Sequence, residues 1–193
     1  MTAKQVILDH INNQDEELCY IAKEIWDHPQ VALEETFASK LLADKLEADG
    51  FSIEWGAGGM PTAFVAEWGQ GAPIIGFLGE YDALPGLSQE LSADRSAIES
   101  GGPGHGCGHN LFGTACMGSV MALKQAMEAE NIAGTIRFYG CPAEETLVGK
   151  TFMARDGVFD DLDAAISWHP GDSNISWNGS SLALNSFKVN FHG

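Results

Sequence analysis

The spacing of apolar residues predicts three long helices. Apolar side chains recur every three or four positions over residues 4–27, 35–49 and 107–130, with a polar interruption at 12–17 in the first, and this is the period expected of a helix that buries one face. The first helix is expected to end just before Pro29, because a residue that precedes proline resists helical backbone angles. Gly50 follows the second helix at a position where helices commonly terminate.

Shorter apolar runs predict strands between and after these helices. The strands are expected at 51–55, 62–68, 73–78, 135–139 and 162–167. The run 73–78 is apolar throughout, as in a strand that is buried on both faces. A short helix is predicted at 150–156, and Phe187, Val189 and Phe191 alternate with polar residues in the pattern of a last strand. Strands that alternate with helices are typical of an α/β fold, so we expect a mostly parallel mixed sheet that is flanked by helices.

Composition and charge narrow the class of protein. The 193 residues include 27 acidic and 10 basic ones, and the net charge is −17. Such a surface repels nucleic acid and anionic membranes, so neither is expected as a partner. The sequence has no apolar run long enough to span a membrane, and its start lacks the basic and apolar parts of a secretory signal. With four cysteines and no such signal, we expect a cytoplasmic protein whose thiols are free or bound to metal.

The stretch GHGCGHN places Cys107 and His109 two residues apart in a glycine-rich segment. The glycines before it favour a loop, and the apolar period after it predicts a helix. A thiol and an imidazole held together suit zinc or a similar divalent metal. The helix start and any bound cation are both expected to favour the thiolate of Cys107. On these residues alone, a glycine-rich turn with a core cysteine is an equally good interpretation.

Acidic residues and a further histidine follow three of the predicted strands. They are Glu80, Asp82, Glu144, Glu145 and His169. Open α/β sheets bind ligands at the carboxyl ends of their strands. Candidate ligands that lie far apart in the sequence are unlike those of a zinc finger and suit a catalytic metal with one position open for water. The alternative for the first acidic pair is a solvated turn, and for the second it is an acidic helix start.

Four other residues have simpler interpretations. Cys19 and Cys116 fall in predicted helices and are expected to be core thiols, whereas Cys141 is expected to be structural. His105 is interpreted either as a residue that orients a metal ligand or as a loop histidine with no metal role.

Four motifs occur in order along the chain, and together they are specific. They are GEYDALP at 79–85, GHGCGHN at 104–110, PAEE at 142–145 and WHP at 168–170. With them the chain resembles the co-catalytic metallo-aminohydrolases, which include aminoacylases, carboxypeptidase G and the hydrolases of auxin conjugates and p-aminobenzoyl-glutamate. The GCGH form is most similar to the p-aminobenzoyl-glutamate and acyl-amino-acid branch. The resemblance covers about residues 28–193.

The resemblance implies a metal site and gives its residues position by position. The positions that match metal ligands are Cys107, His109, Glu145 and His169. They would hold one or two divalent ions, zinc or manganese. Glu144 matches the general base, and Asp82 matches the acidic residue that orients a ligand or bridges the site in relatives. Many relatives have histidine or aspartate where this chain has Glu80, so the resemblance leaves a ligand role for Glu80 open.

The resemblance also implies a domain organisation. Residues 1–184 correspond to the N-terminal part of a zinc-peptidase-like catalytic domain, and residues 185–193 to the first strand of a lid or dimerisation domain. Relatives are nearly twice as long, form homodimers through the lid and supply a last histidine ligand beyond it. The chain is therefore expected to be truncated at the start of the lid and, by itself, to be a poor enzyme.

The activity that the resemblance implies is that of a metal-dependent amidohydrolase. It would cleave the amide bond of an N-acyl amino acid or a peptide-like conjugate such as p-aminobenzoyl-glutamate, so its partner is a small-molecule amide. The alternative, from another class, is an inactive metal-binding or interaction fragment that lacks the C-terminal half of the site. A zinc nucleobase deaminase is excluded, because the sequence has no H-x-E and P-C-x-x-C pair.

Overall fold

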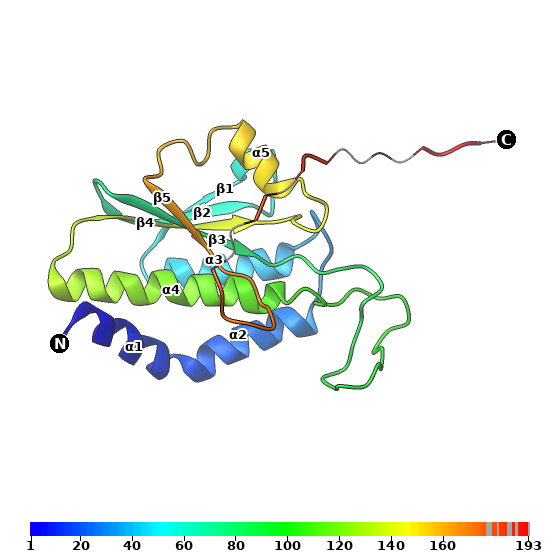
Figure 1. The fold of residues 1–193 in the computed structure, drawn as a ribbon, viewed down its shortest axis with the longest axis horizontal. Helices are drawn as coiled ribbons and strands as arrows, with labels where there is room; N and C mark the ends of the chain where they lie inside the picture. Colours follow the sequence, from blue (N-terminus) through cyan, green and yellow to red (C-terminus); the bar gives the residue numbers. More distant parts are fainter. Residues whose placement is uncertain (177–178, 181, 185–186, 188, 193) are drawn as a thin grey trace.

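The fold is built around a five-stranded sheet in the order β1-β2-β4-β3-β5 (Figure 1). The computed structural model describes the chain except for residues 177–178, 181, 185–186, 188 and 193. The strands are β1 (Ser52–Trp55), β2 (Phe64–Gln70), β3 (Ile74–Glu80), β4 (Gly134–Cys141) and β5 (Ala164–Ser167). The α/β fold with a mixed sheet that the sequence predicts is confirmed.

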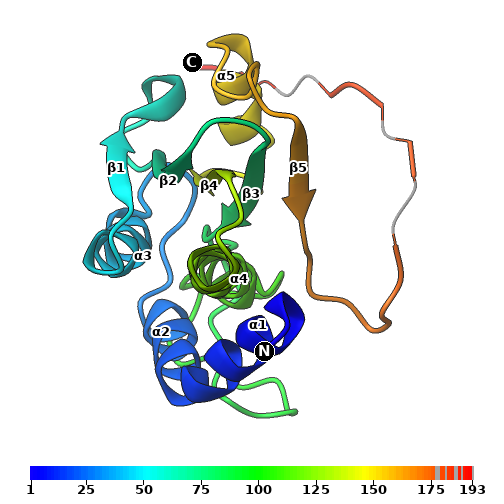
Figure 2. The same cartoon turned by 90° about the vertical axis from the view of Figure 1, so that its left-hand side faces the viewer.

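Among the described residues, five α-helices cover the two faces of this sheet. They are α1 (Ala3–Asn13), α2 (Asp15–Asp27), α3 (Thr36–Ala48), α4 (His109–Glu130) and α5 (Gly149–Arg155). Figure 2 shows α3 and α4 against one face, α1 and α2 beyond them, and α5 on the opposite side. None of these helices is both long and apolar enough to cross a membrane.

The strand pairings decide where the ends of the strands meet. β1 and β2 are antiparallel, as are β2 and β4, whereas β3 runs parallel to both β4 and β5. A short connection suffices for the antiparallel pair β1–β2, while α4 lies between the parallel strands β3 and β4 in the sequence. Because β3, β4 and β5 point the same way, the segments that follow them leave the sheet at one edge.

The helix predicted at 4–27 is in fact two helices that meet at Gln14. The N–H of Gln14 still donates to the carbonyl oxygens of His10 and Ile11, which closes α1. The first turn of α2 is then acidic at 15–17, where carboxylates stabilise the positive end of the helix dipole. The prediction of one continuous helix was wrong, because the polar stretch at 12–17 that interrupts the apolar period is where one helix ends and the next begins.

Two apolar clusters lie on the two sides of the sheet. The larger one joins α2, α3 and α4 to the sheet through buried side chains such as Leu42, Met117 and Phe138. The smaller one packs α5 against the other face, with Tyr139 and Met153 at its centre. The sheet is therefore held from both sides, and the edge at which its parallel strands end is rigidly supported.

Gly113 allows α4 to approach the end of β3 closely. A Cβ atom at this position would lie 2.6 Å from the backbone carbonyl oxygen of Glu80, nearer than side-chain carbons come to backbone. The missing side chain lets the first turn of α4 lie directly beside the last residue of β3. His109 and Glu80 are neighbours for this reason.

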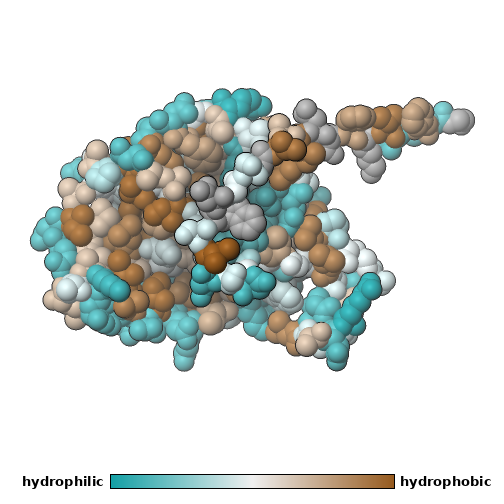
Figure 3. All heavy atoms as spheres, viewed as in Figure 1, coloured by the Kyte–Doolittle hydropathy of each residue, from teal (hydrophilic) through white to brown (hydrophobic). Residues whose placement is uncertain are grey.

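The last predicted strand, at 187–192, stays a prediction. Lys188 lies outside the described residues, and the described Phe187, Val189 and Phe191 belong to no strand and expose 86%, 58% and 91% of their surface. Figure 3 shows apolar side chains on the extension at the C-terminal end of the chain. The division into residues 1–184 and 185–193 therefore rests on the family resemblance.

Candidate active site

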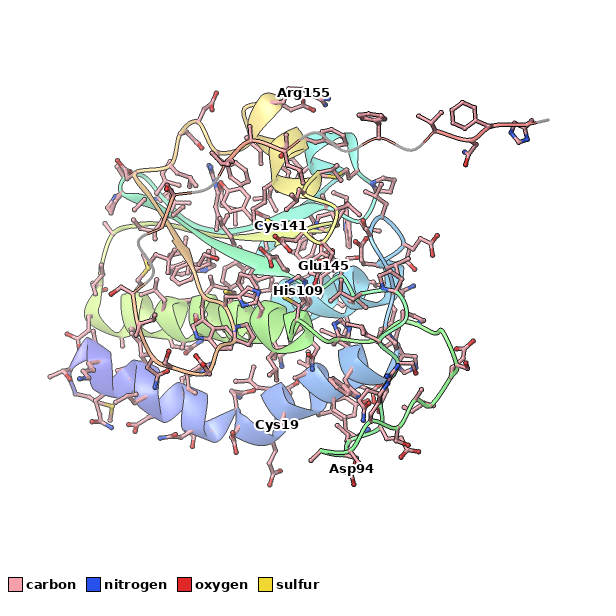
Figure 4. All side chains as sticks on the ribbon, turned by 45° about the vertical axis from the view of Figure 1, so that its right-hand side comes forward. Cys19, Asp94, His109, Cys141, Glu145 and Arg155 are labelled. Carbon is pink, nitrogen blue, oxygen red and sulfur yellow. The ribbon has the colours of Figure 1, made fainter. Side chains whose placement is uncertain are left out.

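The candidate site lies at the edge where β3, β4 and β5 end and α4 begins. Every residue that the sequence predicts as functional lies here. These residues are Asp82, Cys107, His109, Glu144, Glu145 and His169. Figure 4 shows the labelled His109 and Glu145 near each other, between the start of α4 and the sheet. Four segments far apart in the sequence thus meet in one place.

His109, the first residue of α4, is fully buried at the centre of the site. Its Nδ1 lies 2.9 Å from Oδ1 of Asp82 and 3.0 Å from the carbonyl oxygen of Asp82. Both oxygens accept, so in a neutral imidazole the proton sits on Nδ1 and Nε2 keeps its lone pair. Nε2 faces three carboxylates, at 3.0 Å from Glu80, 3.8 Å from Glu144 and 4.0 Å from Glu145.

Asp82 is buried and uses its two carboxylate oxygens on two neighbours. Oδ1 accepts from the ring of His109, and Oδ2 accepts from the backbone N–H of Glu145 at 2.8 Å. One carboxylate thereby fixes both the imidazole of one candidate ligand and the backbone of another. This geometry fits a residue that orients metal ligands.

Cys107 and His169 form the outer part of the site. The Sγ atom of Cys107 lies 3.4 Å from Nε2 of His169, whose Nδ1 lies 2.8 Å from the carbonyl oxygen of Pro170. The proton of a neutral His169 is therefore on Nδ1, and Nε2 is free to bind a metal, as in His109. Ligand atoms of Cys107, His109 and His169 all lie within 4.8 Å of one another.

Glu144 and Glu145 lie in a turn after β4, and α5 begins only at Gly149. The interpretation of this pair as an acidic helix start is therefore wrong. Buried Glu35 accepts from the N–H of Ala143 at 2.9 Å and holds that residue at a φ of +56°, a value that alanine rarely adopts. The turn directs both neighbouring carboxylates towards His109, which a regular strand with alternating side chains would not do.

The structure adds two residues to the site: Glu80, whose role the sequence analysis left open, and Lys150, which it did not predict. Glu80 is buried, and its Oε1 accepts a charged hydrogen bond from Lys150 in the first turn of α5. A buried carboxylate requires a compensating cation, so an acidic residue at the end of a buried strand predicts that a basic side chain lies beside it in the fold. The sequence does not show which basic residue this is, because only the fold brings α5 back over the end of β3.

Charges around His109 determine its protonation in the metal-free protein. Burial alone would lower the pKa of His109, but hydrogen bonds and charges from Asp82 and Glu80 outweigh it and raise the pKa to about 10. Burial also raises the pKa of Glu144, and the charge of Glu80 adds to this. A carboxylate with a raised pKa is suited to take up a proton near neutral pH.

Cys107 differs from the expectation for a cysteine at a helix start. Burial, followed by the charge of Glu145, raises the pKa of its thiol to about 11. In the metal-free protein Cys107 is therefore a thiol, because nearby carboxylates and poor solvation outweigh the partial charge of the helix end. A bound divalent cation reverses this balance and deprotonates a coordinating thiol.

The site fits the metal that the sequence predicts. Three buried atoms point into it: Oε1 of Glu145 has no hydrogen-bond partner among the described residues, and Oε2 of Glu80 and Nε2 of His109 face only each other, at 3.0 Å. Buried polar atoms are seldom left without partners, and a cation would satisfy all three. A thiol, two imidazoles and carboxylates are also the donors that zinc accepts, while carboxylates and imidazoles suit manganese.

The remaining cysteines and His105 have structural positions. Cys116 and Cys141 are buried, as expected, but Cys19 is exposed, so the prediction that it is a core thiol was wrong. His105 is buried and its Nε2 lies 3.1 Å from the carbonyl oxygen of Ile25, which ties the loop before α4 to α2. It contacts none of the candidate ligands through a hydrogen bond.

The buried His105 is expected to make the stability of the metal-free protein depend on pH. Burial lowers its pKa to about 4, from 6.5 in the unfolded chain. The unfolded state then binds more protons between these values, so the free energy of unfolding falls as the pH drops from 6.5 towards 4, by up to roughly 3 kcal/mol. Urea unfolding in the presence of a chelator measures this loss. His105→Gln keeps a donor for Ile25 and should flatten the profile; an unchanged slope would contradict the assignment.

The parallel strands of the sheet bring thiol, imidazole and carboxylate donors to one edge, an arrangement suited to binding a divalent metal. A family profile described as peptidase family M20/M25/M40 matches residues 76–191, and the chain belongs to this family. The resemblance to metallo-aminohydrolases is thereby confirmed.

Individual relatives agree with this membership. The chain is 50% identical to one subunit of the p-aminobenzoyl-glutamate hydrolase of Escherichia coli K12 over 151 residues, which cover 78% of this chain and 31% of that protein. It is 31% identical to the Xaa-Arg dipeptidase of Mus musculus over 186 residues, which cover 90% and 39%. A dinuclear metal-binding M20 peptidase of Bacillus subtilis has a TM-score of 0.66 and 25% identity, over 78% of this chain and 41% of that one. The chain thus spans 31% to 39% of the length of these two curated relatives.

Proposed function

We propose that this chain carries the metal-binding site of an amidohydrolase. The substrate is the amide bond of an N-acyl amino acid or a peptide-like conjugate of the p-aminobenzoyl-glutamate kind. The observation that carries the proposal is the convergence of Cys107, His109 and His169 beside the buried carboxylate oxygens of Glu80 and Glu145. Membership of a peptidase family and the 50% identity to part of a p-aminobenzoyl-glutamate hydrolase support the reaction and the substrate class.

The residues proposed to hold one or two divalent ions, zinc or manganese, are Cys107, His109, Glu145 and His169. When bound, such an ion lowers the pKa of a water molecule and polarises an amide carbonyl. Asp82 keeps Nε2 of His109 directed at the ligand cluster and fixes the backbone of Glu145. These contacts place the donors before any ion arrives, which favours metal binding.

Glu144 is proposed to be the general base. Its carboxylate takes a proton from the attacking water and passes it to the nitrogen of the departing amine. Oε2 of Glu144 lies 3.8 Å from Nε2 of His109, beside the ligand cluster, and about a third of its side chain remains exposed to arriving substrate. Its raised pKa suits a group that must both accept and release the proton.

We further propose that the enzyme works in the cytoplasm and that its longer form is a homodimer joined through a lid domain. All four cysteines are free thiols in the structure, which is consistent with a reducing compartment. The exposed apolar residues at 187, 189 and 191 fit a strand that pairs within such a lid. The measurement that tests the dimer is the molar mass in solution of a chain extended to the length of its relatives.

Metal content tests the proposed site directly. Protein that has been dialysed against a chelator and reconstituted with zinc or manganese should bind metal. Cys107→Ala and His169→Ala each remove one donor and should weaken binding by at least about tenfold. Cys116→Ala is the matched control, because this buried thiol bonds to the carbonyl oxygen of Leu78 outside the cluster. Unchanged metal content in both site variants would rule out the ligand assignment.

An activity assay distinguishes the proposed amidohydrolase from the alternative, an inactive metal-binding or interaction fragment. This chain and a version extended by the following two hundred codons should be assayed with p-aminobenzoyl-glutamate in zinc and in manganese. We expect clear hydrolysis by the longer chain and little by the shorter one. Hydrolysis by neither would favour the inactive alternative, and comparable turnover by both would show that residues 1–193 contain a complete site.

A further inference from the structure

The two carboxylate oxygens of Glu80 lie in different surroundings. Glu80 ends β3, opposite Cys141 of β4, and only 6% of its side chain is exposed. Oε1 accepts a hydrogen bond from the ammonium group of Lys150. Oε2 faces Nε2 of His109 at 3.0 Å and has no other partner among the described residues. One oxygen is therefore fixed from behind, while the other points at the ligand cluster.

Glu80 belongs to a second group of possible metal ligands. Atoms of Glu80, His109 and Glu144 lie within 4.8 Å of one another, and this group shares His109 with the group that contains Cys107 and His169. A divalent ion near Glu80 would satisfy Oε2 and Nε2 together. Both atoms belong to side chains that are more than nine-tenths buried, so water cannot easily replace such an ion.

Lys150 is placed to hold Glu80 in this orientation. It comes from α5, on the opposite side of the sheet from α4, and approaches the oxygen that faces away from His109. Its bond to Oε1 opposes rotation of the carboxylate, which would turn Oε2 away from the cluster. Among the candidate ligands, Lys150 forms a hydrogen bond with Glu80 alone, so an effect of Lys150 on ligand position would pass through Glu80, whereas its charge also acts on Glu144.

We infer that Glu80 is a further metal ligand of the site and that Lys150 is its positioning residue. This inference rests on the proposed metal site and extends it to the one carboxylate whose role the sequence leaves open. It assigns a ligand from the end of β3 in addition to those from α4 and from the segments after β4 and β5.

Cobalt(II) binding to the full 193-residue chain tests the role of Glu80. Glu80→Gln keeps the size and removes the charged donor. It should weaken cobalt binding about tenfold or more and change the ligand-field absorption bands, while the thiolate-to-cobalt band from Cys107 persists. Glu67→Gln is the matched control, since Glu67 is also paired with a cation, Arg137, but lies outside both ligand groups. Cobalt affinity and spectrum should not change in this control.

Lys150 is tested by a cycle of variants with the same readouts. Lys150→Met should weaken cobalt binding about tenfold to a hundredfold, and Lys150→Arg, which can still donate to Oε1, should restore most of it. In the Glu80→Gln background, Lys150→Met should cause no further loss. Losses that add in the double variant, or tighter binding in Lys150→Met, would overturn the positioning role, because Lys150 would then act independently or as an opposing charge.

Cys107→Ala separates this inference from the proposed site. If it abolishes the thiolate-to-cobalt band and weakens binding while Glu80→Gln leaves affinity and spectrum unchanged, the proposed site holds and the role of Glu80 is refuted. If Cys107→Ala also binds cobalt normally, the site itself is misassigned and the inference falls with it. Unfolding midpoints of the metal-free variants identify those that fail to fold, and for these Glu80→Asp, which keeps the charge and withdraws the oxygens, should show the same loss of affinity and changed spectrum.

Discussion

Replacing Glu144 with glutamine is expected to lower amide hydrolysis at least about 100-fold, the usual contribution of a general base. The variant keeps the size of the side chain and removes only its ability to accept a proton. Metal content should stay near normal, because the neighbouring carboxylate, Glu145, is the one assigned to the metal. The measurement compares turnover of p-aminobenzoyl-glutamate and bound zinc or manganese in a chain extended to the length of its relatives.

Glu145→Gln is the matched variant for this experiment. It changes the adjacent residue in the same way and should lose metal together with activity. The geometry alone places the two carboxylates at similar distances from Nε2 of His109, 3.8 Å for Glu144 and 4.0 Å for Glu145. Retained metal in Glu145→Gln and lost metal in Glu144→Gln would therefore show that the two roles are reversed.

The position of the site could be predicted from the sequence because its residues lie at the ends of predicted strands. Apolar runs predict where β3, β4 and β5 end, and the acidic residues and His169 come directly after them. The start of α4 at His109 follows from the glycine-rich loop and the apolar period behind it. Once the strands are known to run parallel, the segments that follow them must meet. The family motifs then add roles, which geometry alone does not distinguish.

Other features depend on contacts between distant segments and could not be predicted. His109 and His169 direct Nε2 at the ligand cluster because carbonyl oxygens of Asp82 and Pro170 face their Nδ1 atoms. The pairing of Glu80 with Lys150 requires α5 to fold back over the end of β3. In each case the deciding partner is set by the tertiary fold, and no local pattern encodes it.

Some errors were avoidable because the pattern itself contained the answer. Cys19 lies in α2, whose buried residues are Ile21, Ala22 and Ile25. Positions three and four apart share a helix face, so Ile21 and Ile25 form the centre of the buried stripe, whereas Cys19 shares a face only with Ala22, at the margin of the stripe. The pattern of α2 therefore favours a marginal position for Cys19 over a core one, and the structure shows the thiol exposed.

The thiol of Cys107 illustrates a different limit. A helix start predicts a lowered pKa, yet burial and the charge of Glu145 raise the pKa to about 11. The helix contributes about half an elementary charge, whereas whole charges of carboxylates lie close by in the folded site. The local sequence shows the charge of the helix end, but only the assembled site shows the burial and the nearby carboxylates. We therefore expect Cys107 to lose its proton when the metal binds.

Asp82→Asn is expected to affect both metal binding and stability. In the native site the two oxygens of Asp82 accept from two N–H groups, those of the His109 ring and the Glu145 backbone. An asparagine offers one oxygen and one NH₂ group, so in either orientation of the amide one N–H donor must face another. We therefore expect about a tenfold to hundredfold loss of zinc affinity and a corresponding loss of activity.

The same substitution should lower the free energy of unfolding of the metal-free protein by about 1–3 kcal/mol, because it leaves a buried donor without an acceptor. Asp44→Asn is the control, since Asp44 pairs with Lys40 on the exposed face of α3 and its loss should change neither quantity. Zinc titration and urea unfolding measure the two effects separately. If zinc affinity falls without a loss of stability, Asp82 acts on the metal through its charge. If both are unchanged, Asp82 does not orient the ligands.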